Sequence, residues 1–550
     1  MKFNIKQIYY PVLFSFVFIA GMILGAYIIN TVSDKSAEES IFQLSLKKYD
    51  KLNDVINLIR DNYVDSVTKE YLVEEAIQSL LSKLDPHSVY ISANDFNEMN
   101  ESLMGNFEGI GVEFRIEHDT VFVLNTISGG PSEKIGIKSG DRIVSVNDTI
   151  IAGVGISNQE VIKKLKGPKN TKVKVSILRR NNSELIDFTI IRDVIPSYSI
   201  DISYMAEDDI GYIKLNRFSG TTHDEFLEAV KKLKFAGMEK LLIDLRGNGG
   251  GYLNTAINIA DEFLDKKSLI VYTEGFNKQR TYEYATKGGS LMNTPFVILI
   301  DEWSASASEV LAGALQDNDK GIIIGKRSFG KGLVQEQIEL NDGSAIRLTV
   351  SRYYTPTGRS IQRPYSKESE DYYMDFYYRL IEENEFIDTM LVDTLKYYTP
   401  KGRVVYGGGG ITPDIFVADT EKYSSYIQEL TNKGLIYEFC FEYSDDNRDI
   451  LKRRYPGAKD FNQKFFINNE LYDKFIYHVL NNGVKKDTKE NLKDVTLIKI
   501  LLKAYIGRNL YNNEAFYPTI HSIDNTFKRG LEILKDNKLY DSIQRASYKD

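Results

Sequence analysis

The sequence is poor in the residues that build disulfides and metal centres. It contains one cysteine, Cys440, and five histidines scattered between His87 and His521. A single thiol excludes an internal disulfide, and neither the thiol nor the histidines have the spacing of a metal site. We therefore predict no metal, and we interpret Cys440 as a small hydrophobic side chain in a core.

Basic residues are also in deficit. Lysine and arginine together number 69 against 77 for aspartate and glutamate, which gives a formal net charge of -8. Binding to nucleic acid relies on a basic face, and the chain shows no polybasic patch. We do not expect nucleic acid as a partner.

Apolar residues, by contrast, are sufficient for more than one core. The hydrophobic fraction is 42% and the charged fraction is 27%, both ordinary values for a globular protein. Single cores stop growing at about 250 to 300 residues, and this chain has 550. We expect three or four folded units.

The longest uncharged run lies at the N-terminus, over residues 8–29. It reaches the ~20 residues that cross a bilayer as a helix. Two lysines precede the run and three acidic residues follow it, which orients the downstream chain away from the cytoplasm. We predict a retained membrane anchor over 1–35, with the rest extracytoplasmic, or periplasmic in a Gram-negative cell. A cleaved signal peptide and a buried core helix remain alternatives, although the run is long for a signal.

Periodicity and composition divide the remainder of the chain into four segments. Residues 36–100 carry apolar positions at helical spacing, and residues 101–194 consist of short strands separated by turns. Residues 195–420 alternate buried strands with helices, which is typical of an α/β core. Residues 421–550 are rich in Lys, Asn, Asp and Tyr at helical spacing. We interpret this last segment as a polar helical region.

A glycine turn precedes the first predicted strand of segment 101–194. Backbone N–H groups at Gly109, Ile110, Gly111 and Val112 are sterically open and can form a nest for a carboxylate. This turn, together with the segment from Gly130 to Ile143, resembles the PDZ domain. The resemblance implies that the C-terminus of a peptide adds as a strand beside the turn. A purely structural β-barrel with a tight turn remains the alternative.

A serine stands where a buried strand turns into a helix. The strand at 295–301 leads into Ser304, Ala305 and Ser306, and an apolar helix follows. Such a turn presents a hydroxyl rigidly, and the helix N-terminus stabilises an oxyanion. Ser306 with Glu309 also fits a capping box, in which the serine only satisfies the first turn of the helix. Local pattern alone favours the cap.

Two further segments carry potential chemistry. Lys331 lies between two glycines and two apolar strands, so its amine can be buried and neutral, as a general base requires. The glycine-rich turn over 244–251 can supply N–H donors to an oxyanion. A solvated loop around the lysine and a structural turn at 244–251 are the alternatives.

Together, these segments resemble the carboxyl-terminal processing (tail-specific) proteases. The motifs occur in the order DLRGNGGG, SASASEVLAGALQDN, GKRSFGKGLVQ, YYTPTGRSIQ and GGITPD, within residues 45–420. The resemblance implies an α/β multidomain chain: a crotonase-like mixed α/β core with an inserted PDZ β-barrel, an N-terminal helical segment and a helical C-terminal region. Trp303 departs from a glycine that many relatives carry, which puts the shape of the subsites in doubt.

The resemblance also assigns roles to residues. Ser306 matches the nucleophile, Lys331 the general base and Gln335 the residue that orients the lysine, while Ala307 and Gly250 match the oxyanion donors. It implies a membrane-anchored serine endopeptidase that takes protein or peptide substrates with free C-termini and needs no cofactor. A catalytically inactive PDZ scaffold is one rival. A Ser-His-Asp protease is another, but no serine motif of that class is present. The sequence does not indicate the oligomeric state.

Overall fold

The computed structural model describes residues 14–25, 50–180, 182–286, 288–365, 372, 374, 376–377, 395–418, 423–485 and 492–546. They divide into two units, Met1–Leu80 and Leu81–Asp550. Residues 14–25 form a helix, and no helix in the described ranges is both long and apolar enough to cross a membrane. The rest of the predicted span 8–29 lies outside the described residues, so the anchor stays a prediction.

The first unit contains the helix α3 (Lys51–Asn62) and most of α4 (Lys69–Ser82). Asp50 caps α3 by accepting a hydrogen bond from the Asn53 N–H at 3.2 Å. Acidic residues lie in the first turn of both helices, where they offset the positive end of the helix dipole.

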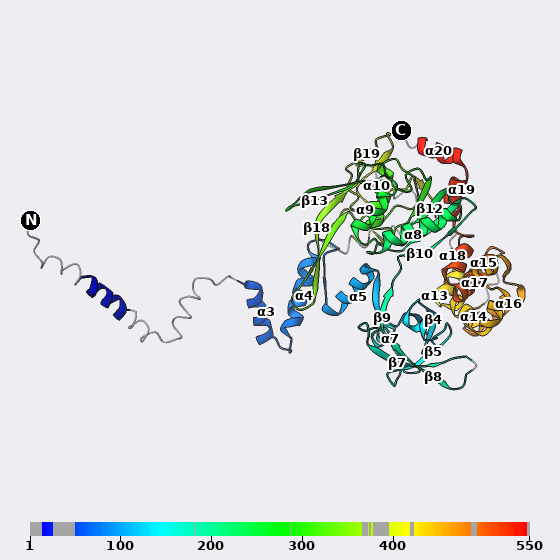
Figure 1. Cartoon of the computed structure of the whole chain (residues 1–550), viewed down its shortest axis with the longest axis horizontal. Coiled ribbons are helices and arrows are strands. Elements are labelled where there is room, and N and C mark those ends of the chain that lie inside the picture. Colours follow the sequence, from blue (N-terminus) through cyan, green and yellow to red (C-terminus); the bar gives the residue numbers. More distant parts are fainter. Residues whose placement is uncertain are drawn as a thin grey trace, which may run out of the picture. The chain divides into compact units, whose positions relative to one another are not determined.

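The core of the second unit is a six-stranded sheet in the order β10-β11-β12-β15-β16-β21 (Figure 1). Its strands are Ile200–Met205, Ile210–Leu215, Lys240–Asp244, Phe296–Ile300, Ile322–Gly325 and Ile415–Phe416. Only β10 is antiparallel to its neighbour. The continuous apolar sequence of the inner strands is what a parallel sheet covered on both faces requires.

Helices cover both faces of this sheet. Alternate residues of β12 point to opposite sides, so that Ile243 packs in one hydrophobic cluster and Leu242 in another. The first cluster includes α8 (Thr222–Phe235), α9 (Leu253–Asp261) and α10 (Ala307–Asp317). The second includes α19 (Asn525–Lys535) and α20 (Asn537–Ala546). The last helices of the chain therefore complete the core of the α/β sheet.

A second, antiparallel sheet has the order β1-β18-β13-β14, with β17 also paired to β18. Its strands are Val89–Ile91, Ala345–Tyr354, Leu269–Gly275, Lys278–Tyr284 and, for β17, Leu333–Glu339. A short ribbon is formed by β19 (Lys396–Tyr398) and β20 (Val404–Tyr406). Because β17 begins two residues after Lys331, its pairing with β18 fixes the direction of the segment that holds the lysine.

The β-rich segment forms a separate six-stranded sheet in the order β3-β4-β5-β7-β8, with β6 paired to β5. Its strands are Val112–Glu117, Thr120–Thr126, Arg142–Val146, Lys172–Leu178, Leu185–Ile191 and, for β6, Thr149–Ile150. The helices α6 (Pro131–Lys134) and α7 (Asn158–Leu165) join it. α5 (Ala93–Met104) precedes it, and β2 (Asn106–Gly109) and β9 (Asp193–Pro196) pair at its two ends.

The C-terminal region contains a helical body with a core of its own. Its helices are α13 (Ser425–Asn432), α14 (Leu435–Arg454), α15 (Ala458–Lys464), α16 (Asn469–Asn481), α17 (Leu492–Tyr511) and α18 (Asn513–Ile520). They appear in yellow to red in Figure 1. Cys440 is fully buried in this body, and burial raises the pKa of its thiol.

One face of the β-rich sheet contacts α14. Arg115, Phe122 and Arg142 stand opposite one another on neighbouring strands. Their partners on α14 repeat every fourth residue: Arg115 lies 3.8 Å from the ring centre of Tyr437, Phe122 packs edge-on against Phe441, and Arg142 forms an ion pair of 2.6 Å with Asp445. The spacing of four places these partners along one ridge of the helix.

Candidate active site

Ser306 lies at the junction between β15 and α10 in a strained conformation. Its backbone has φ 55° and ψ -114°. Positive φ is costly for a residue with a Cβ and persists where the surroundings enforce it, often at functional sites. The strain agrees with a serine presented for chemistry, and Glu309 accepts from the Ser306 N–H as the predicted capping box requires.

Glu309 joins the serine turn to the lysine segment. Its carboxylate is fully buried and accepts hydrogen bonds from the N–H groups of Ser306 at 2.8 Å, Gly330 at 2.7 Å and Lys331 at 2.9 Å, and from the Ser328 hydroxyl at 2.6 Å. Burial raises the pKa of Glu309 to about 7, although the four donors oppose this shift. One carboxylate thus fixes the backbones of Ser306 and Lys331 relative to each other.

Tyr353 provides a second link between the same two segments. Its buried hydroxyl lies within hydrogen-bond distance of the carbonyl oxygens of Ser306 and Lys331. Burial raises its pKa well above the usual value, so the phenol stays protonated and able to donate. Sequence reasoning missed this tyrosine, because its partners are backbone atoms from distant segments.

The Lys331 amine is buried and oriented by Gln335. It donates a hydrogen bond to the Gln335 side-chain oxygen at 2.7 Å, and the Gln335 amide in turn donates to the carbonyl of His87 at 2.6 Å. Burial is the main cause that lowers the pKa of Lys331 to about 8, and the nearby charge of Arg347 contributes. A substantial fraction of such an amine is neutral near physiological pH and can accept a proton.

His87 contributes through its backbone. The sequence predicts a turn residue here, and the N–H groups of His87 and Ser88 both donate to Asp85 at 2.8 Å. The turn presents the His87 carbonyl to Gln335. Burial lowers the pKa of the imidazole to about 4, with Lys331 contributing, so the ring is neutral and adds no second positive charge beside the lysine.

The glycine-rich turn at 244–251 is tied to the serine turn. The Asn248 carbonyl accepts hydrogen bonds from the Ala305 N–H at 3.0 Å and the Ser308 hydroxyl at 2.9 Å. Gly250 adopts φ 100°, and a Cβ there would lie 2.8 Å from the Ser306 Cβ, so only glycine fits. The predicted donors Ala307 and Gly250 are therefore close neighbours.

The Gly250 N–H donates to the Asn248 side chain at 2.9 Å. A role for this N–H as an oxyanion donor therefore requires it to leave that partner, and the assignment of Gly250 stays a prediction. The Ala307 N–H lies at the first position of α10, where the positive end of the helix dipole stabilises an anion.

The predicted carboxylate loop lies at the edge of the β-rich sheet. The carbonyls of Ile110 and Gly111 accept hydrogen bonds from Ser132 at 3.2 Å and Ile127 at 3.0 Å. Within the described residues, the N–H groups of Ile110 and Gly111 meet no acceptor, and Val112 begins β3, the first strand of the sheet order. This arrangement leaves donors and a strand edge for an added peptide.

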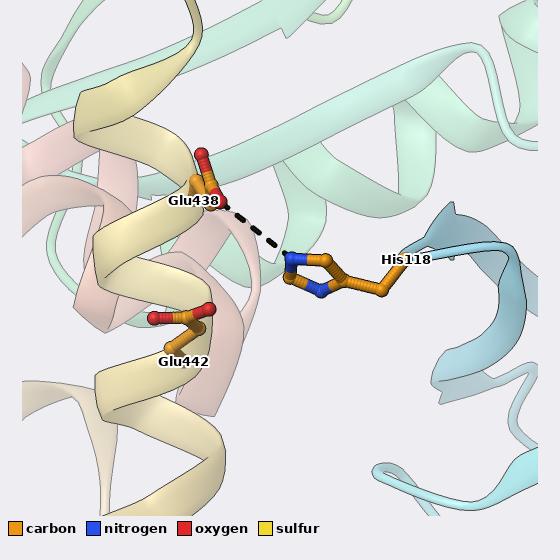
Figure 2. Close-up of side chains that lie close together, drawn as sticks. All are labelled: His118, Glu438 and Glu442. Atoms are coloured by element: carbon orange, nitrogen blue, oxygen red, sulfur yellow. Dashed lines mark ion pairs between the residues drawn. The ribbon is translucent and has the colours of Figure 1, made fainter. Parts of the chain in front are cut away.

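A histidine and two glutamates cluster where the β3–β4 turn faces α14. His118 lies 3.7 Å from Glu438, and donor atoms of His118, Glu438 and Glu442 lie within 4.8 Å of one another (Figure 2). The sequence could not predict this proximity because His118 is more than 300 positions away from the two glutamates. His118 is exposed, and we interpret the pair as part of the contact between the turn and α14.

Comparisons with known proteins place these motifs in a family. The model of Peptidase family S41 matches residues 209–368, and that of the PDZ domain matches residues 109–190. A model described as the activating protease CtpB N-terminal domain matches residues 23–95, and a family of unknown function matches residues 426–512. The carboxy-terminal-processing protease of Bartonella bacilliformis is 36% identical over 63% of this chain and 79% of its own length.

The chain belongs to the carboxy-terminal processing protease family. It is a serine-type peptidase with a PDZ domain and an α/β protease fold. The carboxy-terminal processing protease CtpA of Bacillus subtilis is 34% identical over 58% of this chain and 67% of its own length. Among solved structures, the photosystem II D1 C-terminal processing protease is 27% identical, with a TM-score of 0.33, and covers 56% of this chain and 89% of its own length.

Proposed function

We propose that this chain is a membrane-anchored endopeptidase that binds the C-termini of protein substrates through its PDZ domain and cleaves them with Ser306 and Lys331. The observation that carries the proposal is the buried Lys331 amine, held by Gln335 on a segment that Glu309 joins to Ser306. Such a lysine has a lowered pKa and a fixed direction, as a general base requires.

The proposed reaction proceeds through an acyl-enzyme. The neutral Lys331 amine takes the proton of the Ser306 hydroxyl while the serine oxygen attacks the peptide carbonyl. The Ala307 N–H stabilises the oxyanion that forms, with Gly250 as the predicted second donor. The lysine then gives its proton to the leaving amine, and a water molecule, activated by the same lysine, hydrolyses the ester.

The PDZ domain supplies selection. A peptide that adds beside β3 can place its carboxylate at the open N–H groups of Ile110 and Gly111. The other two predicted donors, Gly109 and Val112, lie in the β2–β9 and β3–β4 pairs. Backbone hydrogen bonds recognise the chain end without reading a long sequence. Such hydrogen bonds require the last residues of the substrate to be extended, so we expect exposed C-termini to bind and C-termini buried in a folded domain not to bind.

The membrane anchor, the topology of the core and the domain limits are parts of the proposal that rest on the sequence. The apolar run 8–29 anchors the chain in a membrane, and the charges around it place the peptidase outside the cytoplasm. The protease core has the crotonase-like topology that the family resemblance implies. The domain limits at residues 35, 100, 194 and 420 stay predictions of the same kind.

The test compares purified residues 35–550 as wild type, Ser306→Ala and Lys331→Met. The matched control is Lys326→Met, because Lys326 lies on the same segment but pairs with Glu302 at 2.8 Å. We expect wild type and the control to cleave an unstructured polypeptide with an apolar C-terminus, followed by mass spectrometry, and the two site variants to lose at least about 1000-fold in kcat/KM.

Two outcomes contradict the proposal. Wild-type protein that binds the polypeptide but never cleaves it favours an inactive PDZ scaffold. Cleavage that survives in Lys331→Met at the wild-type rate excludes the lysine as the base.

A further inference from the structure

The C-terminal helices reach the back of the glycine-rich turn. Asp524 is the residue before α19 and caps it by accepting a hydrogen bond from the Phe527 N–H at 2.9 Å. The same carboxylate accepts two hydrogen bonds from the guanidinium of Arg246, at 3.0 Å and 2.7 Å. Arg246 lies in the turn whose later residues run beside Ser306.

Arg246 is held on both sides by carboxylates. Besides Asp524, it donates to Asp244 with Nε at 3.0 Å and with Nη2 at 2.6 Å. Two-point contacts of this kind fix the plane of a guanidinium as well as its position. The two carboxylates raise the pKa of Arg246 well above its usual range, so the side chain is always charged.

Hydrogen bonds connect the glycine-rich turn, which contains Arg246, to the segment that carries Ser306. Directly after Arg246, the Gly247 N–H donates to the Asp301 carboxylate at 2.9 Å. The next residue, Asn248, binds the Ala305 N–H through its carbonyl and the Gly250 N–H through its side chain. A shift of Arg246 therefore moves the glycines that lie against Ser306 and Ala307.

The position of Asp524 is fixed because α19 packs against the protease sheet. Phe527, Ile533 and Leu534 of α19 are buried in the same cluster as Leu242 and Leu299 of the protease sheet. A Cβ at Gly530 would lie 2.8 Å from the Leu242 side chain, so the helix backbone lies directly on β12. Asp524 thus stands at the end of a helix that is fixed to the sheet.

We infer that Asp524 is a positioning residue for the oxyanion turn and acts through Arg246. The inference rests on the proposed function and extends it, because it makes a residue more than 200 positions after Ser306 part of the apparatus for peptide cleavage. Preorganised donors matter most when charge develops on the substrate oxygen. Loss of the Asp524 charge should therefore lower kcat more than it changes KM.

Asp524→Asn isolates this contact. Asparagine is as good a helix cap as aspartate, so α19 keeps its start while Arg246 loses one of its two anions. The matched control is Asp536→Asn, because Asp536 accepts hydrogen bonds from the N–H groups of Lys538 and Leu539 in the first turn of α20. Among the described residues, it makes no hydrogen bond or ion pair to the glycine-rich turn. Both variants are compared with wild type as the full chain purified in detergent.

The assay uses an internally quenched peptide with an apolar C-terminus and a peptide aldehyde of the same sequence. The aldehyde forms a hemiacetal with a serine, and its oxygen occupies the place of the substrate oxyanion. For Asp524→Asn we expect kcat to fall about 10-fold, with KM within about twofold, and the aldehyde Ki to rise in parallel. Asp536→Asn should match wild type in all three.

The outcomes separate the inference from the proposed function. If wild type neither cleaves the peptide nor binds the aldehyde, both the proposed function and the inference are contradicted. If wild type is active and Asp524→Asn has the same kcat and aldehyde Ki, only the inference fails. A fall in kcat without any change in aldehyde Ki, or an equal fall in Asp536→Asn, also overturns the role at the oxyanion turn.

Discussion

The C-terminal region holds the protease sheet and the PDZ sheet in different ways. On the protease sheet, α19 buries Phe527, Ile533 and Leu534 among aliphatic strand residues. On the PDZ sheet, α14 relies on the Arg142–Asp445 ion pair and on aromatic contacts that include Arg115 over Tyr437. Apolar burial contributes in proportion to the buried area, whereas the gain from an ion pair is offset by the cost of removing its charges from water. The first contact is therefore part of the protease fold, and the second can open under mild conditions.

The largest effect should come from the apolar contact. Phe527 is buried, its ring centre lies 3.8 Å from that of His521, and it packs edge-on against Tyr212. We expect Phe527→Ala to lower the free energy of unfolding by about 3 to 5 kcal/mol, because the cavity exposes the second face of the protease sheet. Urea unfolding followed by circular dichroism measures the change.

Phe276→Ala is the control for that experiment, because the Phe276 side chain is fully exposed at the turn between β13 and β14. Equal stability of the Phe527 and Phe276 variants would show that α19 is not part of the protease core.

A medium effect is expected in the PDZ domain itself. Gly111 has φ 72°, and a Cβ there would lie 3.0 Å from the Ile195 side chain. Gly111→Ala should distort the carboxylate loop and weaken binding of a fluorescent peptide with a free C-terminus by about 10-fold, measured by anisotropy. Hydrolysis of a peptide too short to reach the PDZ domain should not change.

Gly129→Ala controls for backbone strain alone, because Gly129 has φ 73° and no atom lies within 4 Å of the added carbon. If both alanine variants bind the peptide with wild-type affinity, the loop at Gly111 is not the site of the carboxylate.

The smallest effect should come from the charged contact. We expect Asp445→Asn to lower the free energy of unfolding by about 1 kcal/mol, because the asparagine oxygen can still accept a hydrogen bond from Arg142. Hydrogen exchange of α14 should nevertheless become faster, because the Arg142 ion pair of 2.6 Å is lost. The effect should shrink at high salt as the charges are screened.

Asp446→Asn offers a matched comparison for Asp445→Asn. Asp446 pairs with Arg180 at 2.7 Å, but its side chain is 68% exposed. A larger change in exchange from Asp446 than from Asp445 would contradict the view that burial ranks these contacts.

Sequence reasoning could predict what local pattern and family motifs encode. The apolar strands of the α/β sheet, the helix at Asn158–Leu165 and the strand-to-helix turn at Ser306 all follow from periodicity and turn residues. The family that these motifs indicated is confirmed by the relatives. The assigned roles of Ser306, Lys331 and Gln335 stay predictions, although the structure brings Lys331 and Gln335 together.

The rest depends on contacts between distant segments. The sequence pattern offered Glu309 as a cap for one helix, but not as the acceptor that also holds Gly330 and Lys331. Arg246 and Asp524 are separated by 278 positions, and their pairing exists only because α19 returns to the protease sheet. Hydrophobic periodicity does not indicate that a distant helix packs back on the sheet. For this reason no functional residue could be predicted in the C-terminal region.

The central claim, that Lys331 acts as the base, is tested most directly by the pH dependence of kcat/KM in wild type and Arg347→Gln. The amine must be neutral to accept the serine proton, so activity should fall as the pH drops through the lysine pKa of about 8. The positive charge of Arg347 lowers the pKa of Lys331. Removal of that charge should therefore move the acidic limb of the pH–activity profile to higher pH. Arg352→Gln, on the same strand, should leave the limb in place. A limb that stays at the same pH in Arg347→Gln, or that persists in residual activity of Lys331→Met, would contradict the account.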